Sequence, residues 1–122
     1  MGYYSDAALV LSKSGVATLK RLMAGIPKDS EAYQESCCLI LHPDKQRTDP
    51  KTRARLFFWK DVKWYDDFPE IRFIEDLLDA LDECEFVFCR IGENFDDSEM
   101  RGFFRDDPFG VGIERSLRIG AA

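Results

Sequence analysis

The sequence predicts an α+β domain in which an antiparallel sheet carries two helices on one face. Two segments have apolar residues at helical spacing, and several short apolar runs have the length of strands. In chain order these segments read β-α-β-β-α-β-β-β, the split β-α-β order of a ferredoxin-like sheet followed by a C-terminal β extension. The 122 residues are enough to bury one core, so we expect residues 1–122 to form a single domain.

A strand and a helix are predicted at the start of the chain. An apolar run ends the strand over residues 4–11, and Ser12 or Ser14 can cap the helix that follows by accepting a free backbone amide. Gly25 and Pro27 are typical of a helix end. The apolar residues of this helix recur at helical spacing and are Val16, Leu19, Leu22, Met23 and Ile26.

The centre of the chain predicts three stretches of strand. Residues 36–41 form a compact apolar run suited to a buried strand, and a polar, proline-containing loop follows at residues 43–53. Residues 56–59 restart the strand pattern. Residues 62–65 continue it after a turn or bulge near residues 60–61.

The second helix has the clearest pattern. Pro69 fits the first helical position, where its missing amide costs nothing. One apolar stripe faces the core, and acidic residues on the other side face water. The stripe consists of Ile71, Ile74, Leu77, Leu78 and Leu81. A strand is predicted at 86–91, an acidic loop at 93–99, a further strand at 100–105 and a last one at 113–119.

Charge is distributed unevenly along the chain. Residues 61–107 hold sixteen Asp or Glu and five Lys or Arg, a net formal charge of −11, whereas residues 1–60 carry +4. Phosphate contacts need clustered cations, so a segment of this charge repels nucleic acid and attracts basic surfaces. We therefore expect a protein partner with a basic surface and no direct nucleic-acid binding.

A membrane partner is not expected. No run of apolar residues approaches the roughly 18 that are needed to cross a bilayer. The N-terminal residues lack the basic segment followed by an apolar one that is typical of a secretory signal. The sequence therefore predicts a cytoplasmic protein.

Aromatic residues stand among the acidic ones and form adjacent pairs. Neighbours on a strand point to opposite faces, so a one-sided core cannot absorb both members of such a pair. The pairs are Phe57-Phe58, Trp64-Tyr65 and Phe103-Phe104. Some aromatic surface should therefore be exposed or covered by a partner, and a second copy of the chain in a homodimer is one such partner.

The acidic segment at residues 61–107 and the adjacent aromatic pairs together predict a non-enzymatic protein-binding module. Carboxylates steer a basic partner into place, and aromatic side chains supply contact area at interfaces. The predicted partner-binding residues are Asp66, Asp67, Glu93, Asp96, Asp97 and Glu99 for the electrostatic contact, with Trp64 and Tyr65 as anchors.

A metal-dependent enzyme is the first alternative. The loop at residues 93–99 concentrates carboxylates of the kind that bind calcium or magnesium, although their spacing is not that of an EF-hand. No glycine-rich phosphate loop, nucleophile elbow or Cys/His dyad with a third member is visible. We therefore assign no catalytic residue, no cofactor and no metal ligand. A self-assembling structural protein is a further alternative.

The tetrapeptide His42-Pro43-Asp44-Lys45 resembles the signature loop of J-domain cochaperones. In that family the loop joins two antiparallel helices and contacts Hsp70, so the resemblance implies a J-domain-like cochaperone. The residues before it, 36–41, contain no cation and read as a strand, which favours a strand followed by a proline turn.

Three stretches resemble small uncharacterised proteins encoded by bacteriophages and prophages. They are Met1-Gly2-Tyr3-Tyr4-Ser5-Asp6, Val62-Lys63-Trp64-Tyr65 and Arg90-Ile91-Gly92-Glu93. Small phage proteins often act by binding and blocking a host protein, and anti-CRISPR proteins, some of them strongly acidic, are one such group. The resemblance implies an inhibitor of a host nucleic-acid-handling complex in the cytoplasm of a bacterial host. It implies no role for any single residue.

Overall fold

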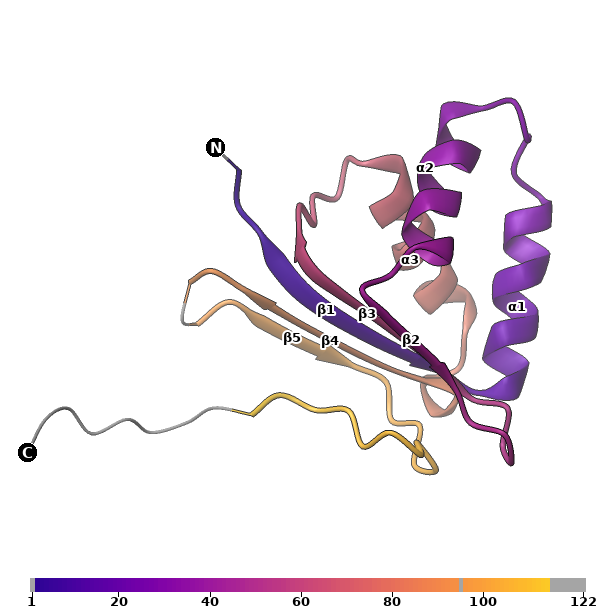
Figure 1. Ribbon diagram of the computed structural model, residues 1–122, viewed down its shortest axis with the longest axis vertical. Helices are drawn as coiled ribbons and strands as arrows, with labels where there is room; N and C mark the ends of the chain where they lie inside the picture. The colour runs from indigo at the N-terminus through magenta and orange to yellow at the C-terminus, as the bar shows by residue number, and fades with distance from the viewer. Residues whose placement is uncertain (1, 95, 115–122) are drawn as a thin grey trace, which may run out of the picture.

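Five strands and four helical segments make up the computed structural model, which describes residues 2–94 and 96–114 (Figure 1). In chain order they are β1 (Ser5–Leu11), α1 (Lys13–Ala24), α2 (Glu31–Leu41), β2 (Lys45–Thr48), β3 (Arg55–Val62), α3 (Pro69–Ala80), the 3-10 helix η1 (Glu83–Glu85), β4 (Phe86–Gly92) and β5 (Ser98–Arg101). The strands form one sheet in the order β2-β3-β1-β4-β5, and all neighbours are antiparallel. The predicted α+β class and antiparallel sheet are confirmed.

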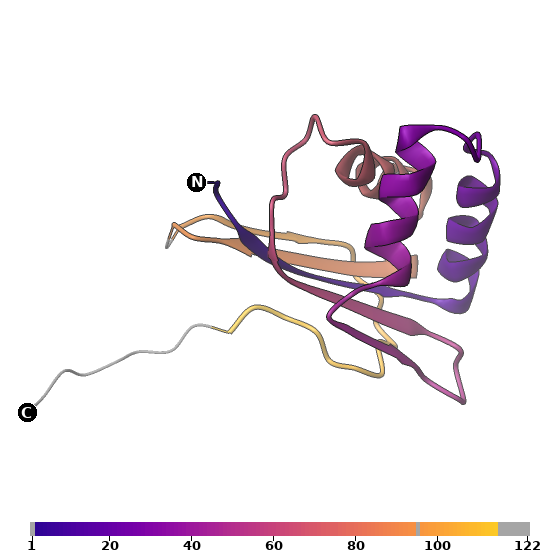
Figure 2. The ribbon, with the colours of Figure 1, turned by 45° about the horizontal axis from the view of Figure 1, so that its top comes forward.

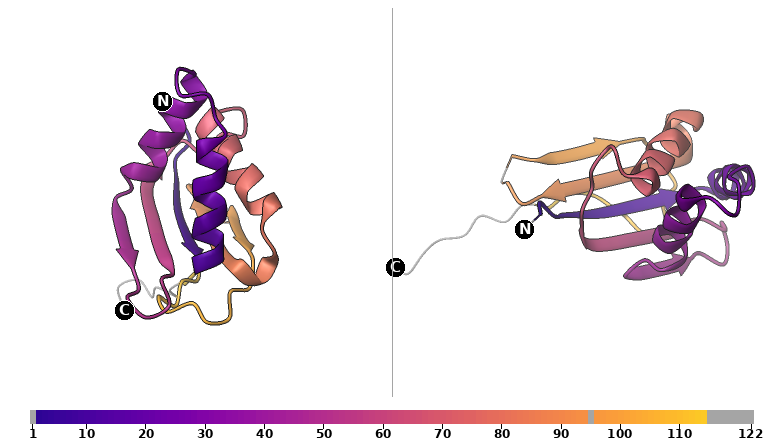
Figure 3. Two further views of the ribbon diagram at one scale, coloured as in Figure 1. Left: turned by 90° about the vertical axis from the view of Figure 1, so that its right-hand side faces the viewer. Right: turned by 90° about the horizontal axis from the view of Figure 1, so that it is seen from above.

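The two faces of the sheet are covered differently (Figure 2). Helices α1, α2 and α3 pack on one face over the main core, in which Leu9, Phe57 and Phe88 are fully buried. On the other face a smaller cluster around Val10 packs against residues 102–114, which we call the strap. Figure 3 shows α2 on the β2 side of the sheet and α3 on the β4–β5 side.

Residues 36–41, predicted as a strand, are the C-terminal part of α2. Ser30 caps this helix because its Oγ accepts the N–H of Tyr33 at 3.2 Å. Ser36 and Ile40, four residues apart, are buried on one side of the helix. A short apolar run fits a buried strand and a helix face equally well, which explains the error. The sheet therefore carries three helices instead of two, and the connection from β1 to β2 contains two helices where one was expected.

The polar loop predicted at residues 43–53 contains the edge strand β2. All four residues of β2 are exposed, so the strand lacks the apolar alternation by which a strand is recognised in a sequence. Asp49 stabilises the turn to β3 by accepting the N–H of Thr52 at 2.8 Å and its hydroxyl at 2.6 Å. Arg53 closes the turn with φ 65°.

A bulge interrupts β3 where the sequence predicted one. Two residues of β3, Lys60 and Asp61, stand opposite a single residue of β1. Asp61 adopts φ 54° and donates its N–H to Asp6 Oδ1 at 3.0 Å. The predicted strand over 62–65 is wrong, because β3 ends at Val62 and the residues after it lead into α3.

The first and third helices agree with their predictions. Ser12 caps α1, since its Oγ accepts the N–H of Gly15 at 3.1 Å. Pro69 occupies the first turn of α3. The predicted apolar stripe is buried along its whole length, and it consists of Ile71, Ile74, Leu77, Leu78 and Leu81.

The C-terminal part of the chain forms one strand and the strap. β5 covers Ser98–Arg101, so the strand predicted at 100–105 begins earlier and ends at Arg101. Gly102 then turns the chain with φ 85°, and a Cβ at this position would lie 2.2 Å from the carbonyl oxygen of Phe86. Of the predicted strand 113–119, residues 113 and 114 have no regular structure and the remainder lies outside the described residues.

The strap covers some of the aromatic side chains that the main core cannot bury. Phe57 is buried in the main core, whereas Phe58 lies half-buried on the opposite face of β3. Phe104 of the strap packs against the smaller cluster around Val10, but its neighbour Phe103 is 67% exposed. Within the described residues, no helix has both the length and the apolar character needed to cross a membrane.

Candidate functional site

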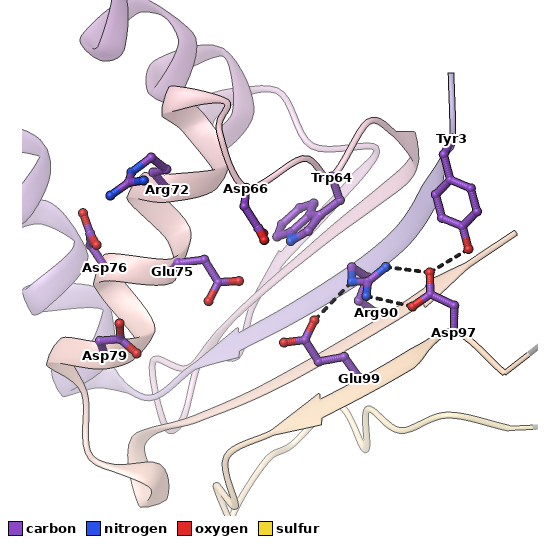
Figure 4. A pocket seen from close by; sticks show the side chains of 10 residues that line it. All are labelled: Tyr3, Trp64, Asp66, Arg72, Glu75, Asp76, Asp79, Arg90, Asp97 and Glu99. Atoms are coloured by element: carbon purple, nitrogen blue, oxygen red, sulfur yellow. Dashed lines mark hydrogen bonds and ion pairs between the residues drawn. The ribbon is translucent and has the colours of Figure 1, made fainter. Parts of the chain in front are cut away.

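A cleft of about 620 Å³ lies between α3 and the β4–β5 hairpin (Figure 4). We call it the acidic cleft, because six of its lining residues carry carboxylates. The lining residues are Tyr3, Trp64, Asp66, Arg72, Glu75, Asp76, Asp79, Arg90, Asp97 and Glu99. Pockets that hold small molecules are mostly apolar with a few polar groups. This cleft is lined mostly by charged residues, which favours an extended, charged ligand.

Helix α3 supplies half of the carboxylates because its two sides differ. Ile71, Ile74 and Leu78 are buried in the main core. The helical period turns the intervening acidic residues away from the core, and the β4–β5 hairpin lies opposite them. These acidic residues are Glu75, Asp76 and Asp79.

Arg90 on β4 binds two carboxylates of the hairpin. Its Nη2 lies 3.0 Å from Asp97 Oδ1, and its Nε lies 3.1 Å from Glu99 Oε1. The hydroxyl of Tyr3 donates to the second oxygen of Asp97 at 2.6 Å. Because Arg90 and Tyr3 both donate to it, the pKa of the Asp97 carboxyl lies below its ordinary value. The lowered pKa keeps Asp97 anionic at neutral pH, and the Arg90 guanidinium is shared between Asp97 and Glu99.

Arg101 on β5 makes the corresponding contacts with α3. Its guanidinium binds Glu75 and also Asp79, with 3.1 Å between Nη2 and Asp79 Oδ1. Burial alone would lower the pKa of Arg101, but the hydrogen bond to Glu75 raises it above the ordinary value. These contacts join the edge strand to the helix and hold the two walls of the cleft together.

The cleft remains anionic after the chain's own arginines are counted. The six lining carboxylates and two lining guanidiniums, Arg72 and Arg90, give a net formal charge of −4. Counting Arg101, which binds two of these carboxylates from β5, brings the charge to −3. Asp66 and Asp76 form no hydrogen bond or ion pair with the residues that the structure describes. Opposed carboxylates in one cleft produce a field that attracts cations.

Trp64 lies at the back of the acidic cleft with its ring in the main core. The side chain is 9% exposed, and its ring centroid lies 5.9 Å from that of Trp59 and 5.5 Å from that of Phe88. Its Nε1 is buried without a hydrogen-bond partner among the described residues, and Figure 4 shows it pointing into the cleft. In contrast, Trp59 Nε1 donates to the carbonyl oxygen of Leu39 at 2.8 Å.

The structure brings four of the eight predicted partner-binding residues together in the acidic cleft. These are Trp64, Asp66, Asp97 and Glu99. Of the other four, Asp67, Glu93 and Asp96 are exposed but do not line the cleft. Tyr65 is half-buried, and its hydroxyl accepts the N–H of Tyr3 at 2.7 Å. Trp64 is buried and therefore offers an N–H group to the cleft rather than a stacking surface.

Six lining residues were not predicted from the sequence. They are Tyr3, Arg72, Glu75, Asp76, Asp79 and Arg90. The helical pattern predicts that the acidic side of α3 faces water, and Asp76 and Asp79 are exposed, but the pattern gives no sign of the hairpin opposite them. A signal that could have identified it is the density of acidic residues on this helix.

The geometry of the 93–99 loop bears on the enzyme alternative. Within residues 2–94 and 96–114, no three His, Cys, Asp or Glu side chains are grouped so that they could hold a metal ion. Asp97 and Glu99 are instead joined to each other by Arg90, which binds Asp97 Oδ1 and Glu99 Oε1. Exposed Glu93 and Asp96 do not converge with them on a common point of the cleft.

The His42-Pro43-Asp44 stretch joins a helix to a strand. His42 is the C-terminal cap of α2, and the chain then enters β2. The carboxylate of Asp44 accepts the N–H of Lys60 at 2.7 Å, which fixes the stretch against β3. A J-domain loop joins two antiparallel helices, so the surroundings of this tripeptide differ from those that the resemblance implies.

Comparison of the chain with models of protein families found no match, and comparisons with curated proteins and with solved structures found none either. The arguments about function below therefore start from the geometry of the acidic cleft.

Proposed function

We propose that this chain is a non-enzymatic protein-binding module whose acidic cleft receives a basic surface of a partner protein. The observation that carries the proposal is the net charge of the cleft, which stays at −3 after Arg72, Arg90 and Arg101 are counted. The same charge disfavours direct binding of nucleic acid, because phosphates would meet carboxylates.

The rigidity of the cleft supports a docking role. Arg90 and Arg101 each bind two carboxylates, so most of the charged side chains are held in place before a partner arrives. Preorganised groups lose less conformational entropy on binding than freely rotating ones. Asp66 and Asp76, which have no partner among the described residues, are the carboxylates most available to a cationic surface.

An inhibitor of a nucleic-acid-handling complex is the specific form of this proposal. A cationic surface that normally holds nucleic acid fits an anionic cleft, and occupying it would displace the nucleic acid. The resemblance of Met1–Asp6 and two further stretches to bacteriophage proteins agrees with such a role in a bacterial host, as in anti-CRISPR proteins. A cytoplasmic location follows from this proposal.

The test is capture of basic partners by an immobilised chain from nuclease-treated bacterial lysate, at low and at high salt. Asp66→Lys combined with Asp76→Lys should abolish capture of the basic proteins retained at low salt. Asp29→Lys combined with Asp106→Lys is the matched control, because it changes the net charge equally at two exposed residues outside the cleft. With a purified partner, the cleft variant should lower the association rate by roughly tenfold. Equal capture by both double variants would contradict the proposal.

A second copy of the chain is the competing occupant. The basic edge strand β2 and the acidic cleft lie at opposite edges of the sheet, so head-to-tail contact would pair opposite charges. Sedimentation at low and high salt separates this case from a foreign partner. Salt-sensitive self-association that Asp66→Lys removes would favour assembly, whereas a monomer under both conditions would favour a foreign partner.

A further inference from the structure

The two tryptophans of the chain differ in one respect that points to a ligand. Both indole rings belong to the main core, but only Trp59 Nε1 has an acceptor, the carbonyl oxygen of Leu39. Trp64 Nε1 is buried in the wall of the acidic cleft and has no acceptor among the described residues. A buried donor without an acceptor destabilises the fold, because it has lost its hydrogen bonds to water. An acceptor supplied by a ligand would recover that free energy.

The carboxylates beside Trp64 have capacity for a further cation. Asp66 forms no bond with the described residues, and Figure 4 shows it and Glu75 on the α3 side of the indole nitrogen. Glu75 uses Oε2 to bind Arg101, and Glu99 uses Oε1 to bind Arg90. The second oxygen of each therefore remains available. A cation seated there would contact up to three carboxylates from two walls of the cleft.

The chemistry of this position requires a ligand with two different groups. A cation satisfies the carboxylates but cannot accept the Trp64 N–H, because guanidinium and ammonium groups are donors only. A polyamine would leave the indole donor unsatisfied for the same reason. A polypeptide segment that carries a cationic side chain has both groups, because its main-chain carbonyl is a strong acceptor.

Guanidinium fits this position better than ammonium does. Two guanidiniums already bind carboxylates of the cleft, and each binds two at once: Arg90 in the hairpin, and Arg101 from β5 across to α3. The planar fork of arginine suits such paired contacts, whereas the ammonium of lysine acts as a point charge.

We infer that the acidic cleft binds an arginine of a partner polypeptide, with Asp66, Glu75 and Glu99 receiving the guanidinium and Trp64 Nε1 donating to a main-chain carbonyl of the same segment. This inference rests on the proposed function and specifies the chemical group that the partner inserts.

The test follows the two indole N–H signals of the ¹⁵N-labelled chain in NMR spectra. The probe is the capped tripeptide acetyl-Gly-Arg-Gly-amide. Its citrulline counterpart keeps the carbonyls and loses the charge, and propylguanidine keeps the charge and lacks a carbonyl. The arginine peptide should shift the Trp64 indole proton downfield, as a new hydrogen bond does. The Trp59 signal, whose donor is already bonded to Leu39, should stay in place and serves as the internal control.

Two variants assign the contacts. Asp66→Asn should weaken binding of the arginine peptide by roughly tenfold, the loss expected for one charge-assisted hydrogen bond. Asp96→Asn, an exposed neighbour outside the cleft, should leave binding unchanged. Trp64→Phe removes the N–H donor. It should lower the affinity for the arginine peptide by roughly fivefold and leave the affinity for propylguanidine unchanged. Because the rings of Trp64 and Trp59 are in contact, the fold of each variant is checked by the dispersion of its backbone amide signals.

The inference is overturned if the arginine peptide leaves the Trp64 signal in place, if the citrulline peptide moves it equally, or if Asp66→Asn binds as well as the wild type. Propylguanidine that matches the peptide in affinity and in shift would also overturn it, since the carbonyl would then have no role. The proposed function has a separate readout. Partner capture that depends on the cleft, with no response to the arginine peptide, would retain the function and reject the arginine.

Discussion

The Nη2 atom of Arg90 lies 3.0 Å from Oδ1 of Asp97, and this pair connects the central part of β4 to the loop before β5. Tyr3 extends the connection to the N-terminal segment, since its hydroxyl donates to Asp97 and accepts the N–H of Asn94 at 2.9 Å. One carboxylate thus links the N-terminal segment to β4 and to the loop before β5. The shape of one wall of the acidic cleft depends on it.

Replacing Asp97 should loosen this wall. Asp97→Asn removes the charge that Arg90 and Tyr3 bind, and we expect the free energy of unfolding to fall by about 1 kcal/mol at neutral pH. Urea unfolding measures the change. Asp96→Asn is the matched control, because Asp96 is exposed and outside the cleft. Equal losses in the two variants would show that the pair with Arg90 contributes nothing specific.

The Asp97 contribution should also depend on pH. Hydrogen bonds from Arg90 and Tyr3 lower the pKa of Asp97 below the ordinary value of 3.8. The unfolded chain therefore takes up the proton more readily than the folded one, and stability is lost as the pH falls. The difference in unfolding free energy between wild type and Asp97→Asn should be full above about pH 5 and should vanish as the pH falls through the lowered pKa. A difference that is constant with pH would contradict this assignment.

Glu70 should have the opposite dependence. Glu70 lies in the first turn of α3 and lines a pocket with Glu35 of α2. Burial is the larger cause that raises the pKa of Glu70, and the charge of Glu35 is the second. A raised pKa means that the folded chain favours the protonated form of Glu70. The contribution of Glu70 to stability is therefore full at low pH and is lost as the pH rises through the raised pKa. Glu70→Gln imitates the protonated form and should stabilise the chain by about 0.5 kcal/mol at neutral pH, as relief of a screened like-charge contact does.

Thermal unfolding of Glu70→Gln at several pH values measures this effect. The gain over wild type should disappear below about pH 4, where Glu70 of the wild type is also protonated in both states. Glu93→Gln, which removes one exposed carboxylate elsewhere, is the control for the change in net charge. If Glu93→Gln stabilises the chain equally, the effect arises from net charge and not from the surroundings of Glu70.

The sequence identified the elements whose pattern is decided locally. Helix α3 has a continuous apolar stripe and Pro69 in its first turn, and α1 has a serine cap, so both could be predicted. Helix α2 could not, because the apolar run at its end fits a strand equally well and Ser30 lies six residues before that run. Strand β2 is polar along its whole length, and only its pairing with β3 makes it a strand.

The candidate site was predicted in part for a related reason. Asp66, Asp97 and Glu99 were selected by local charge density, and these three do line one cleft. Arg90 and Arg101 could not be assigned, because their role depends on which carboxylates the sheet and α3 bring next to them. Trp64 was selected as an exposed anchor but is buried, since the loop after β3 folds its ring onto Trp59. Local composition predicts charge, whereas opposition of charges across a cleft depends on tertiary packing.

The strap over the second face of the sheet should control access to Cys89. Cys89 is the only buried cysteine among the four, all of which lie in the described residues and are free. It packs in the cluster that Phe104 and the rest of the strap cover. Burial, followed by the nearby Asp107, raises the pKa of its thiol and disfavours the reactive thiolate. Alkylation of Cys89 therefore reports opening of the strap.

Gly102 gives the means to open the strap, because the chain leaves β5 there with φ 85° and passes close to the carbonyl oxygen of Phe86. A Cβ in Gly102→Ala would meet that oxygen and would also strain the backbone, so we expect Cys89 to be alkylated by iodoacetamide roughly tenfold faster. Peptide mass spectrometry measures the rate, and exposed Cys38 on α2 serves as the internal reference. Gly112→Ala is the matched control, since a Cβ on Gly112 meets no atom within 4 Å. Because the strap lies opposite the helices, partner binding at the acidic cleft should be unaffected by Gly102→Ala, and a loss of binding would show that the two faces of the sheet are coupled.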